Sequence, residues 1–150
     1  MTTLAPTAHP GRHIAPRQRL TGPQRIAVGL LGFLAVTGYA GGAWMVTHPT
    51  TWIPTRYLDG TPFADWLLPG IALFLINGVL PTIALVATVR RWERAWLGLA
   101  LIGATLLGWL AVQIPVVGFA APFQVTYGAV AVALIALGVR IRGAGTTPRP

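Results

Sequence analysis

Residues 67–89 read LLPGIALFLINGVLPTIALVATV, and residues 90–94, which follow at once, read RRWER. The first segment carries no charged residue, whereas four of the next five residues are charged. With a rise of about 1.5 Å per residue, the apolar segment is long enough to cross a hydrocarbon core of about 30 Å. The pattern predicts a transmembrane helix whose charged end lies at the cytoplasmic interface.

The composition is that of an integral membrane protein. Of the 150 residues 54% are hydrophobic and only 9% are charged, and the mean hydropathy is +0.65. A soluble domain usually has about 25% charged residues. The net charge of +8 comes from arginines beside the apolar segments. There they act as topology signals and attract anionic lipid headgroups, so the positive charge does not indicate nucleic-acid binding.

Three further apolar segments complete the pattern. We predict an all-α membrane protein, a four-transmembrane-helix bundle with antiparallel up-and-down topology. The predicted spans are residues 26–46, 66–89, 95–117 and 122–139.

The predicted transmembrane domain covers residues 25–142. Residues 1–24 and 143–150 contain several Pro, Gly and Thr residues without apolar periodicity, and we predict that they form disordered cytoplasmic tails. The loop of residues 47–66 carries Trp and Tyr, which favour the membrane interface, so it is expected to lie along the membrane surface.

Arginine is distributed asymmetrically around these spans. With four spans, only Arg56 falls on one side of the membrane. On the other side are Arg12, Arg17, Arg19, Arg25, Arg90, Arg91, Arg94, Arg140, Arg142 and Arg149. Because positively charged loops stay in the cytoplasm, we predict a multi-pass protein of the bacterial cell (inner) membrane with both termini cytoplasmic.

The residues needed for most membrane chemistry are missing. The chain has no cysteine, which excludes disulfides and cysteine-ligated metals. Between their interfacial ends the predicted spans contain no Asp, Glu, Lys, Arg or His, the residues that proton-coupled transporters and haem-binding bundles usually use. We therefore expect no catalytic residues, no metal site and no cofactor.

The most informative polar residue within a span is Asn77, which is predicted to lie near the bilayer midplane. Pro81 has no N–H to bond to the carbonyl of Asn77, and Gly78 loosens the turn between them. We predict a kink at these three residues. Two roles stay open: hydrogen bonding between helices around a structural kink, or a ligand or ion site at a broken helix.

A second group of polar and aromatic residues falls in the outer half of the last three spans. Its members are Asp65, Trp109, Gln113, Gln124 and Tyr127. Asp65 immediately precedes a span and is suited to cap the start of that helix. We predict that the group forms either a structural hydrogen-bond network or a small outward-facing pocket for a lipid or small molecule.

Small residues recur at intervals of four within three of the spans. They are Gly38 and Gly42; Ala100, Ala104 and Gly108; and Ala129 and Ala133. Such ridges let helices approach closely, either within one chain or between copies of it.

Several segments of the chain resemble a family of small bacterial, actinobacterial four-span integral membrane proteins. These segments are TPFADWLLPG (61–70), INGVLP (76–81), RRWERAW (90–96), GWLAVQIPVVGF (108–119) and PFQVTYG (122–128). The resemblance covers about residues 26–139. It implies the fold and the membrane location, and it implies no activity and no catalytic residue.

Three functions are compatible with these observations. The first is a non-enzymatic accessory or lipid-interacting component of the membrane, because the spans carry no charge. The second is a small oligomeric transporter or channel that uses the kink at Asn77. The third is a membrane enzyme with an outward-facing polar site. The expected partners are the lipid bilayer and either another membrane protein or further copies of the chain; nucleic acid is not expected.

Overall fold

The computed structural model describes residues 19–51, 53–119 and 121–145, and all regular structure in these ranges is helical. The elements are α1 (Gly22–Thr47), the 3₁₀-helix η1 (Thr55–Leu58), α2 (Leu67–Leu73), the π-helix η2 (Phe74–Val79), α3 (Leu80–Val89), α4 (Ala95–Val117) and α5 (Ala121–Gly145). Because α2, η2 and α3 follow one another without a break, they form one continuous helix. Four helices are therefore long and apolar enough to cross a bilayer, which confirms the predicted all-α, four-helix architecture.

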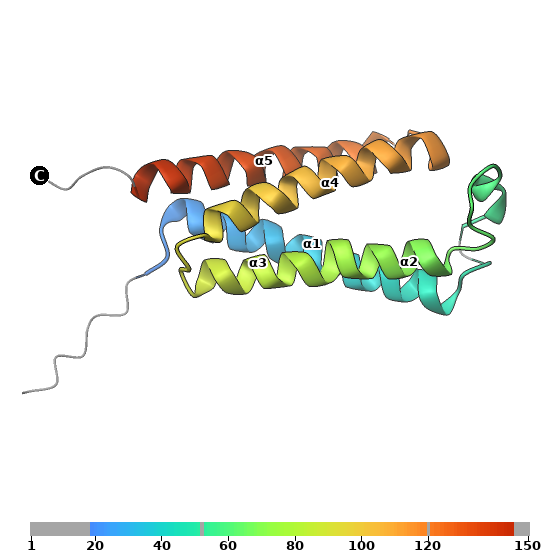
Figure 1. The fold of residues 1–150 in the computed structure, drawn as a ribbon, viewed down its shortest axis with the longest axis horizontal. Helices are drawn as coiled ribbons and strands as arrows, with labels where there is room; N and C mark the ends of the chain where they lie inside the picture. Colours follow the sequence, from blue (N-terminus) through green and yellow to red (C-terminus); the bar gives the residue numbers. More distant parts are fainter. Residues whose placement is uncertain (1–18, 52, 120, 146–150) are drawn as a thin grey trace, which may run out of the picture.

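The four helices form two antiparallel hairpins (Figure 1). One hairpin pairs α1 with the continuous helix α2–η2–α3, and the other pairs α4 with α5. As a result, the start of α1, the α3–α4 turn and the end of α5 lie together at one end of the bundle. The loop of residues 48–66 lies at the opposite end.

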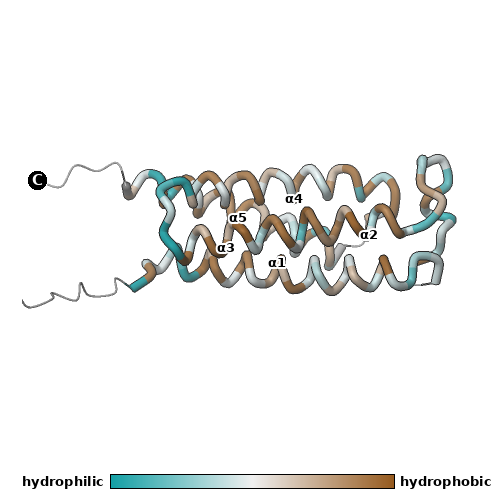
Figure 2. The backbone as a smooth tube through the Cα atoms, turned by 60° about the horizontal axis from the view of Figure 1, so that its bottom comes forward, coloured by the Kyte–Doolittle hydropathy of each residue, from teal (hydrophilic) through white to brown (hydrophobic). Residues whose placement is uncertain are grey.

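Nearly all of the described positive charge lies at one end, which we call the arginine end; the opposite end is the loop end. The arginine end carries Arg19, Arg25, Arg90, Arg91, Arg94, Arg140 and Arg142. Figure 2 shows a strongly hydrophilic run around the α3–α4 turn, next to largely hydrophobic helices. The grouping predicted from the sequence is confirmed for these residues, whereas Arg12, Arg17 and Arg149 lie outside the described residues.

The first helix starts earlier than predicted. α1 begins at Gly22, so residues 22–24, which the sequence assigned to the tail, are helical. Gln24 Oε1 accepts a hydrogen bond from the backbone N–H of Thr21 at 3.0 Å, and Pro23 lies in the first turn, where its missing N–H costs nothing. These local signals lie outside the apolar segment, which is why hydrophobicity alone placed the start too late.

The last helix ends later than predicted. α5 continues to Gly145, beyond the predicted limit of 139, and residues 143–145 are helical rather than part of a tail. A helix does not have to stop where the hydrocarbon stops. Here the guanidinium of Arg142 lies 4.8 Å from the centre of the Trp96 ring, and this cation–π contact ties the end of α5 to α4. The remaining predicted tail segments, 1–18 and 146–150, lie outside the described residues.

The apolar core lies where α1, α4 and α5 meet, in the half of the bundle nearer the arginine end. Its largest fully buried side chains are Leu31, Leu34, Leu99 and Leu134. Among the buried members of this cluster in the described chain, only Ala84 comes from α3. Consequently α3 contributes little to the core, and its packing against α4 is much less extensive than the packing of α4 against α5.

The α4–α5 hairpin is held by glycines that bring two backbones into contact. A Cβ atom placed on Gly103 would lie 2.6 Å from the carbonyl oxygen of Ala131, and one on Gly138 would lie 2.7 Å from that of Trp96. Only glycine permits such an approach. By contrast, Ala104 is exposed and Gly108 has no neighbour within 4 Å, so this part of the predicted small-residue ridge faces outward.

The α1 helix packs against α2 and η2 in the same way. A Cβ atom on Gly42 would lie 2.7 Å from Phe74 Cα, and one on Gly38 would overlap the carbonyl group of Asn77. The predicted ridge formed by Gly38 and Gly42 therefore packs within the chain, against the α2–η2 segment.

The contact at Gly38 predicts the effect of a single methyl group. Gly38→Ala should lower the free energy of unfolding by about 3 kcal/mol, because the added carbon meets backbone atoms that cannot rotate away. The measurement is thermal unfolding of the purified protein in a mild detergent. The control is Gly29→Ala in the same helix, where nothing lies within 4 Å and stability should be unchanged or slightly higher. Equal stability of the two variants would contradict the packing described here.

Candidate functional site

The predicted kink lies in a π-helical segment. η2 spans Phe74–Val79, and the N–H of Leu80 bonds to the carbonyl of Leu75, five residues earlier. Pro81 follows directly, and it cannot donate a hydrogen bond. Asn77 and Gly78 therefore lie in a wide π-type turn, and a bend of the helix at these residues stays a prediction. Single π-turns within α-helices often occur at functional sites.

The carbonyl of Asn77, to which Pro81 cannot donate, faces the α1 backbone. Because a Cβ atom on Gly38 would overlap this carbonyl, the Gly38 hydrogen in that direction points at the oxygen. Such Cα–H···O contacts contribute about 0.5–1 kcal/mol each. The carbonyl is thus covered by the α1 backbone.

A hydrogen-bonded pair of side chains, one from each helix, leads to a second carbonyl of the π-segment. Thr82 Oγ1 donates to the carbonyl of Gly78 at 2.9 Å, and it lies 3.1 Å from the hydroxyl of Tyr39 on α1. With the threonine hydrogen directed at Gly78, the tyrosine is the donor of the second bond. The Tyr39 ring also packs edge-on against Phe74, with ring centres 4.8 Å apart. These contacts hold α1 against η2 in addition to the close backbone contacts at Gly38 and Gly42.

The Asn77 side chain is the unsatisfied group of this region. Asn77 is 6% exposed, and its Nδ2 has no hydrogen-bond partner among the described residues. A buried amide donor without a partner usually costs about 1–3 kcal/mol. In the described part of the chain, therefore, Asn77 does not act as a hydrogen-bonding link between helices through this nitrogen.

The five residues of the predicted outer group have separate surroundings. Asp65 Oδ1 accepts a hydrogen bond at 2.9 Å from the N–H of Leu67, the first residue of α2, whose N-cap position is Trp66. Gln124 is buried, and its Nε2 donates to the carbonyl of Gly118 at 3.1 Å in the α4–α5 turn. Both side chains therefore bond to nearby backbone.

The remaining members of the group lie on α4 and α5. Tyr127 lies between two aromatic rings, with its ring centre 5.8 Å from that of Phe33 and 6.0 Å from that of Phe123. Trp109 and Gln113 are half-buried on α4. No hydrogen bond within the described residues joins any two of the five, and none of them lines either of the two best-formed cavities. An outer polar pocket stays a prediction.

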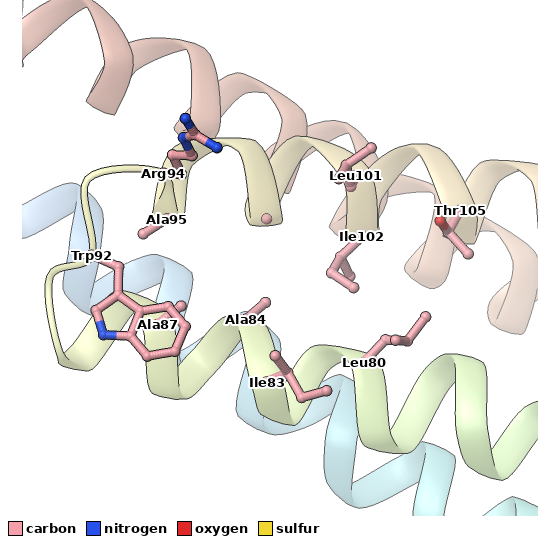
Figure 3. Close-up of a pocket in the computed structure, with 11 residues that line it drawn as sticks. Leu80, Ile83, Ala84, Ala87, Trp92, Arg94, Ala95, Leu101, Ile102 and Thr105 are labelled. Atoms are coloured by element: carbon pink, nitrogen blue, oxygen red, sulfur yellow. The ribbon is translucent and has the colours of Figure 1, made fainter.

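A groove that the sequence did not predict lies between α3 and α4 (Figure 3). Its volume is about 390 Å³, and its lining includes Ala84 and Ala87 from α3 and Ala95 and Gly98 from α4. These small residues leave space between two helices that contact each other sparsely. Thr105 and Arg94 are the lining residues with polar side chains apart from the indole of Trp92. The sequence signal was the run of small residues on facing helices, but which helices face each other cannot be read from the chain.

The α3–α4 turn closes this groove at the arginine end. The N–H of Trp92 bonds to the carbonyl of Ala87 at 3.0 Å, and the N–H of Arg91 bonds to that of Thr88 at 3.2 Å. This pair of bonds is a Schellman motif, in which Arg91 has the left-handed conformation (φ 56°) that glycine usually supplies. The side chain of Arg91 also bonds to the carbonyl of Arg19, which anchors the turn to the start of α1.

A second, smaller groove of about 320 Å³ lies between α1 and the α2–η2 segment. It is lined by Ala43, Val46, Thr47, Ile71, Phe74 and Leu75. No charged residue borders it, so it has no feature that would orient a ligand. Among the described residues there is also no cluster of three or more His, Cys, Asp or Glu side chains that could hold a metal ion.

No family model, curated protein or solved structure matches this chain.

The unsatisfied amide predicts an unusual response to a substitution. Asn77→Leu has similar volume and removes the unpartnered Nδ2, so stability in detergent should be unchanged or higher by up to about 1 kcal/mol. The comparison variant is Thr82→Val, which removes the bond to Tyr39 and should lower stability by about 0.6 kcal/mol, the average for such bonds in membranes. A larger loss of stability for Asn77→Leu than for Thr82→Val would contradict this prediction, because it would show that the Asn77 amide has a hydrogen-bond partner.

Proposed function

We propose that the protein is a non-enzymatic, lipid-interacting component of a bacterial inner membrane, with both termini in the cytoplasm. The observation that carries this proposal is the arginine end, next to which a lipid-facing apolar groove opens. An arginine near a membrane surface attracts anionic lipid by about 1 kcal/mol. Glu93 is the single acidic residue of the chain outside the loop of residues 48–66, so little internal charge opposes that attraction.

The same arginines support the orientation. Positively charged segments next to spans are retained in the cytoplasm, and here they come from three separate parts of the chain. The tryptophans are consistent with a membrane boundary at each end: Trp92 and Trp96 lie at the arginine end, and Trp44 and Trp66 lie at the loop end. Such aromatic residues favour the headgroup region.

The two alternatives have less support. A transporter or channel centred on the kink would draw on the unpartnered Asn77 amide, but the neighbouring carbonyl is covered by Gly38 and neither cavity includes Asn77. A membrane enzyme would draw on Asp65, whose carboxylate already bonds to the first N–H of α2. The lipid-interacting function therefore remains the proposal that the described residues favour.

The proposed function is tested by measuring which lipids stay bound to the protein when it is extracted from vesicles. The intact protein is reconstituted into phosphatidylcholine vesicles containing phosphatidylglycerol, extracted gently, and its retained lipid is quantified by mass spectrometry. We expect phosphatidylglycerol to be enriched, and the double substitution Arg90→Gln with Arg94→Gln to reduce the enrichment about tenfold. Arg56→Gln at the loop end should leave it unchanged. Lipid retained in the proportions of the vesicle by the unsubstituted protein would contradict the proposal.

The orientation is tested by labelling single cysteines, which the cysteine-free chain makes simple. Asp59→Cys lies at the loop end and Glu93→Cys at the arginine end, and both positions are exposed. A membrane-impermeant maleimide applied to intact cells should label Asp59→Cys and should label Glu93→Cys only after the membrane is permeabilised. The reverse pattern would show that the termini lie outside.

A further inference from the structure

The groove between α3 and α4 has the depth of one membrane leaflet. Along α4 it extends from Arg94 at the arginine end to Thr105, which corresponds to about 16 Å of helix. Half of a hydrocarbon core of about 30 Å is nearly the same length. The groove therefore starts in the headgroup region and ends near the bilayer midplane, as one lipid chain of that leaflet does.

The walls of the groove are apolar and its floor is made of small residues. Leu80 on α3 and Ile102 on α4 point toward each other across it, as Figure 3 shows. Ala84 on α3 and Gly98 on α4 also line it. A Cβ atom on Gly98 would lie 3.6 Å from Ala84 Cβ, which is ordinary contact. The floor is thus filled by backbone and methyl groups, and the space above it is open to the lipid side.

The mouth of the groove combines an aromatic ring with a positive charge. The Schellman turn places Trp92, which is 55% exposed, beside Ala87 on the α3 side (Figure 3). Arg94 precedes the first residue of α4 and lines the same end of the groove, with its guanidinium turned away from α3 in this view. Arg94 is exposed and has no ion pair within the described residues. An exposed guanidinium at headgroup level is suited to bind a phosphate oxygen.

We propose that this groove is a specific site for a single anionic phospholipid, with one acyl chain along α3 and α4 and the phosphate bound by Arg94. The inference rests on the proposed lipid-interacting function and adds the site and the class of ligand. A lipid chain leaves one apolar environment for another, so hydrophobic transfer does not select it. Selection comes from the fit of the chain against the small-residue floor and from the charge of Arg94.

The test uses native mass spectrometry of the intact protein in detergent, titrated with phosphatidylglycerol or with phosphatidylcholine of the same acyl chains. The unsubstituted protein should bind the first phosphatidylglycerol at least about fivefold more tightly than the first phosphatidylcholine. Gly98→Leu, which fills the groove, should weaken the first binding step for both lipids. Gly108→Leu is the matched control on the same helix, because Gly108 is open and does not line the groove.

The charge is tested separately from the groove. Arg94→Gln should remove the preference for phosphatidylglycerol and leave phosphatidylcholine binding unchanged, whereas Arg140→Gln, at the same end but outside the groove, should keep the preference. Thermal unfolding verifies that each variant is folded. If Gly98→Leu is not, Thr105→Phe at the exposed midplane end of the groove replaces it.

The outcomes separate the two proposals. Equal binding of the first lipid by Gly98→Leu and Gly108→Leu, or a preference that survives Arg94→Gln, would overturn the specific site and leave the general interaction with anionic lipid standing. An unsubstituted protein that shows no preference at any stoichiometry would overturn the proposed function as well.

Discussion

The contact between the bare backbone of Gly38 and the carbonyl of Asn77 is the constraint on which the bundle depends. In the bilayer core, no water is available to form a hydrogen bond with a backbone N–H or C=O group that has no partner within its own helix. Pro81, which has no N–H to donate, stands four residues after Asn77, and Asn77 itself lies in the π-helical segment. A glycine on the partner helix covers the carbonyl and removes the need for a polar partner. The Tyr39–Thr82–Gly78 hydrogen bonds then hold the same two helices in register.

The packing within each hairpin is closer than the packing between α3 and α4. In each hairpin, glycines bring the two helices into close contact. These are Gly38 and Gly42 in the first hairpin and Gly103 and Gly138 in the second. Between the hairpins, α3 contributes little to the core and leaves a groove against α4. In water such a seam would be a defect, because exposed apolar walls cost free energy. In a membrane the same walls face lipid tails, and the proposed function uses this seam to bind one lipid.

The sequence was informative about features that depend on one helix alone. The apolar segments placed all four helices, and the arginines predicted which helix ends lie together. Asp65 was expected near a helix start, and its carboxylate bonds to the first N–H of α2. The sequence also located the irregularity at Asn77, because Pro81 removes a specific hydrogen bond. Its form as a π-helix was not predictable, since an α-helical kink meets the same local requirement.

Properties that depend on two helices were beyond the sequence. The ridge at Gly38 is used in packing while Gly108 is open, although both fit the same small-residue pattern. The groove depends on Ala84 facing Gly98, and nothing in the chain indicates that pairing. For the same reason the sequence could not show that Gln124 and Asp65 bond to nearby backbone, because a linear pattern does not show which partner a side chain will choose.

The most direct test of this account is cross-saturation NMR of the deuterated protein in nanodiscs with protonated lipid, in which acyl-chain protons are irradiated and the loss of backbone amide signal is recorded. We expect strong saturation at Gly98, which lines the proposed lipid groove, and little at Gly78, which is buried against α1. Comparable saturation at the two glycines, or none at Gly98, would contradict the proposal that lipid enters the α3–α4 groove while α1 shields Gly78.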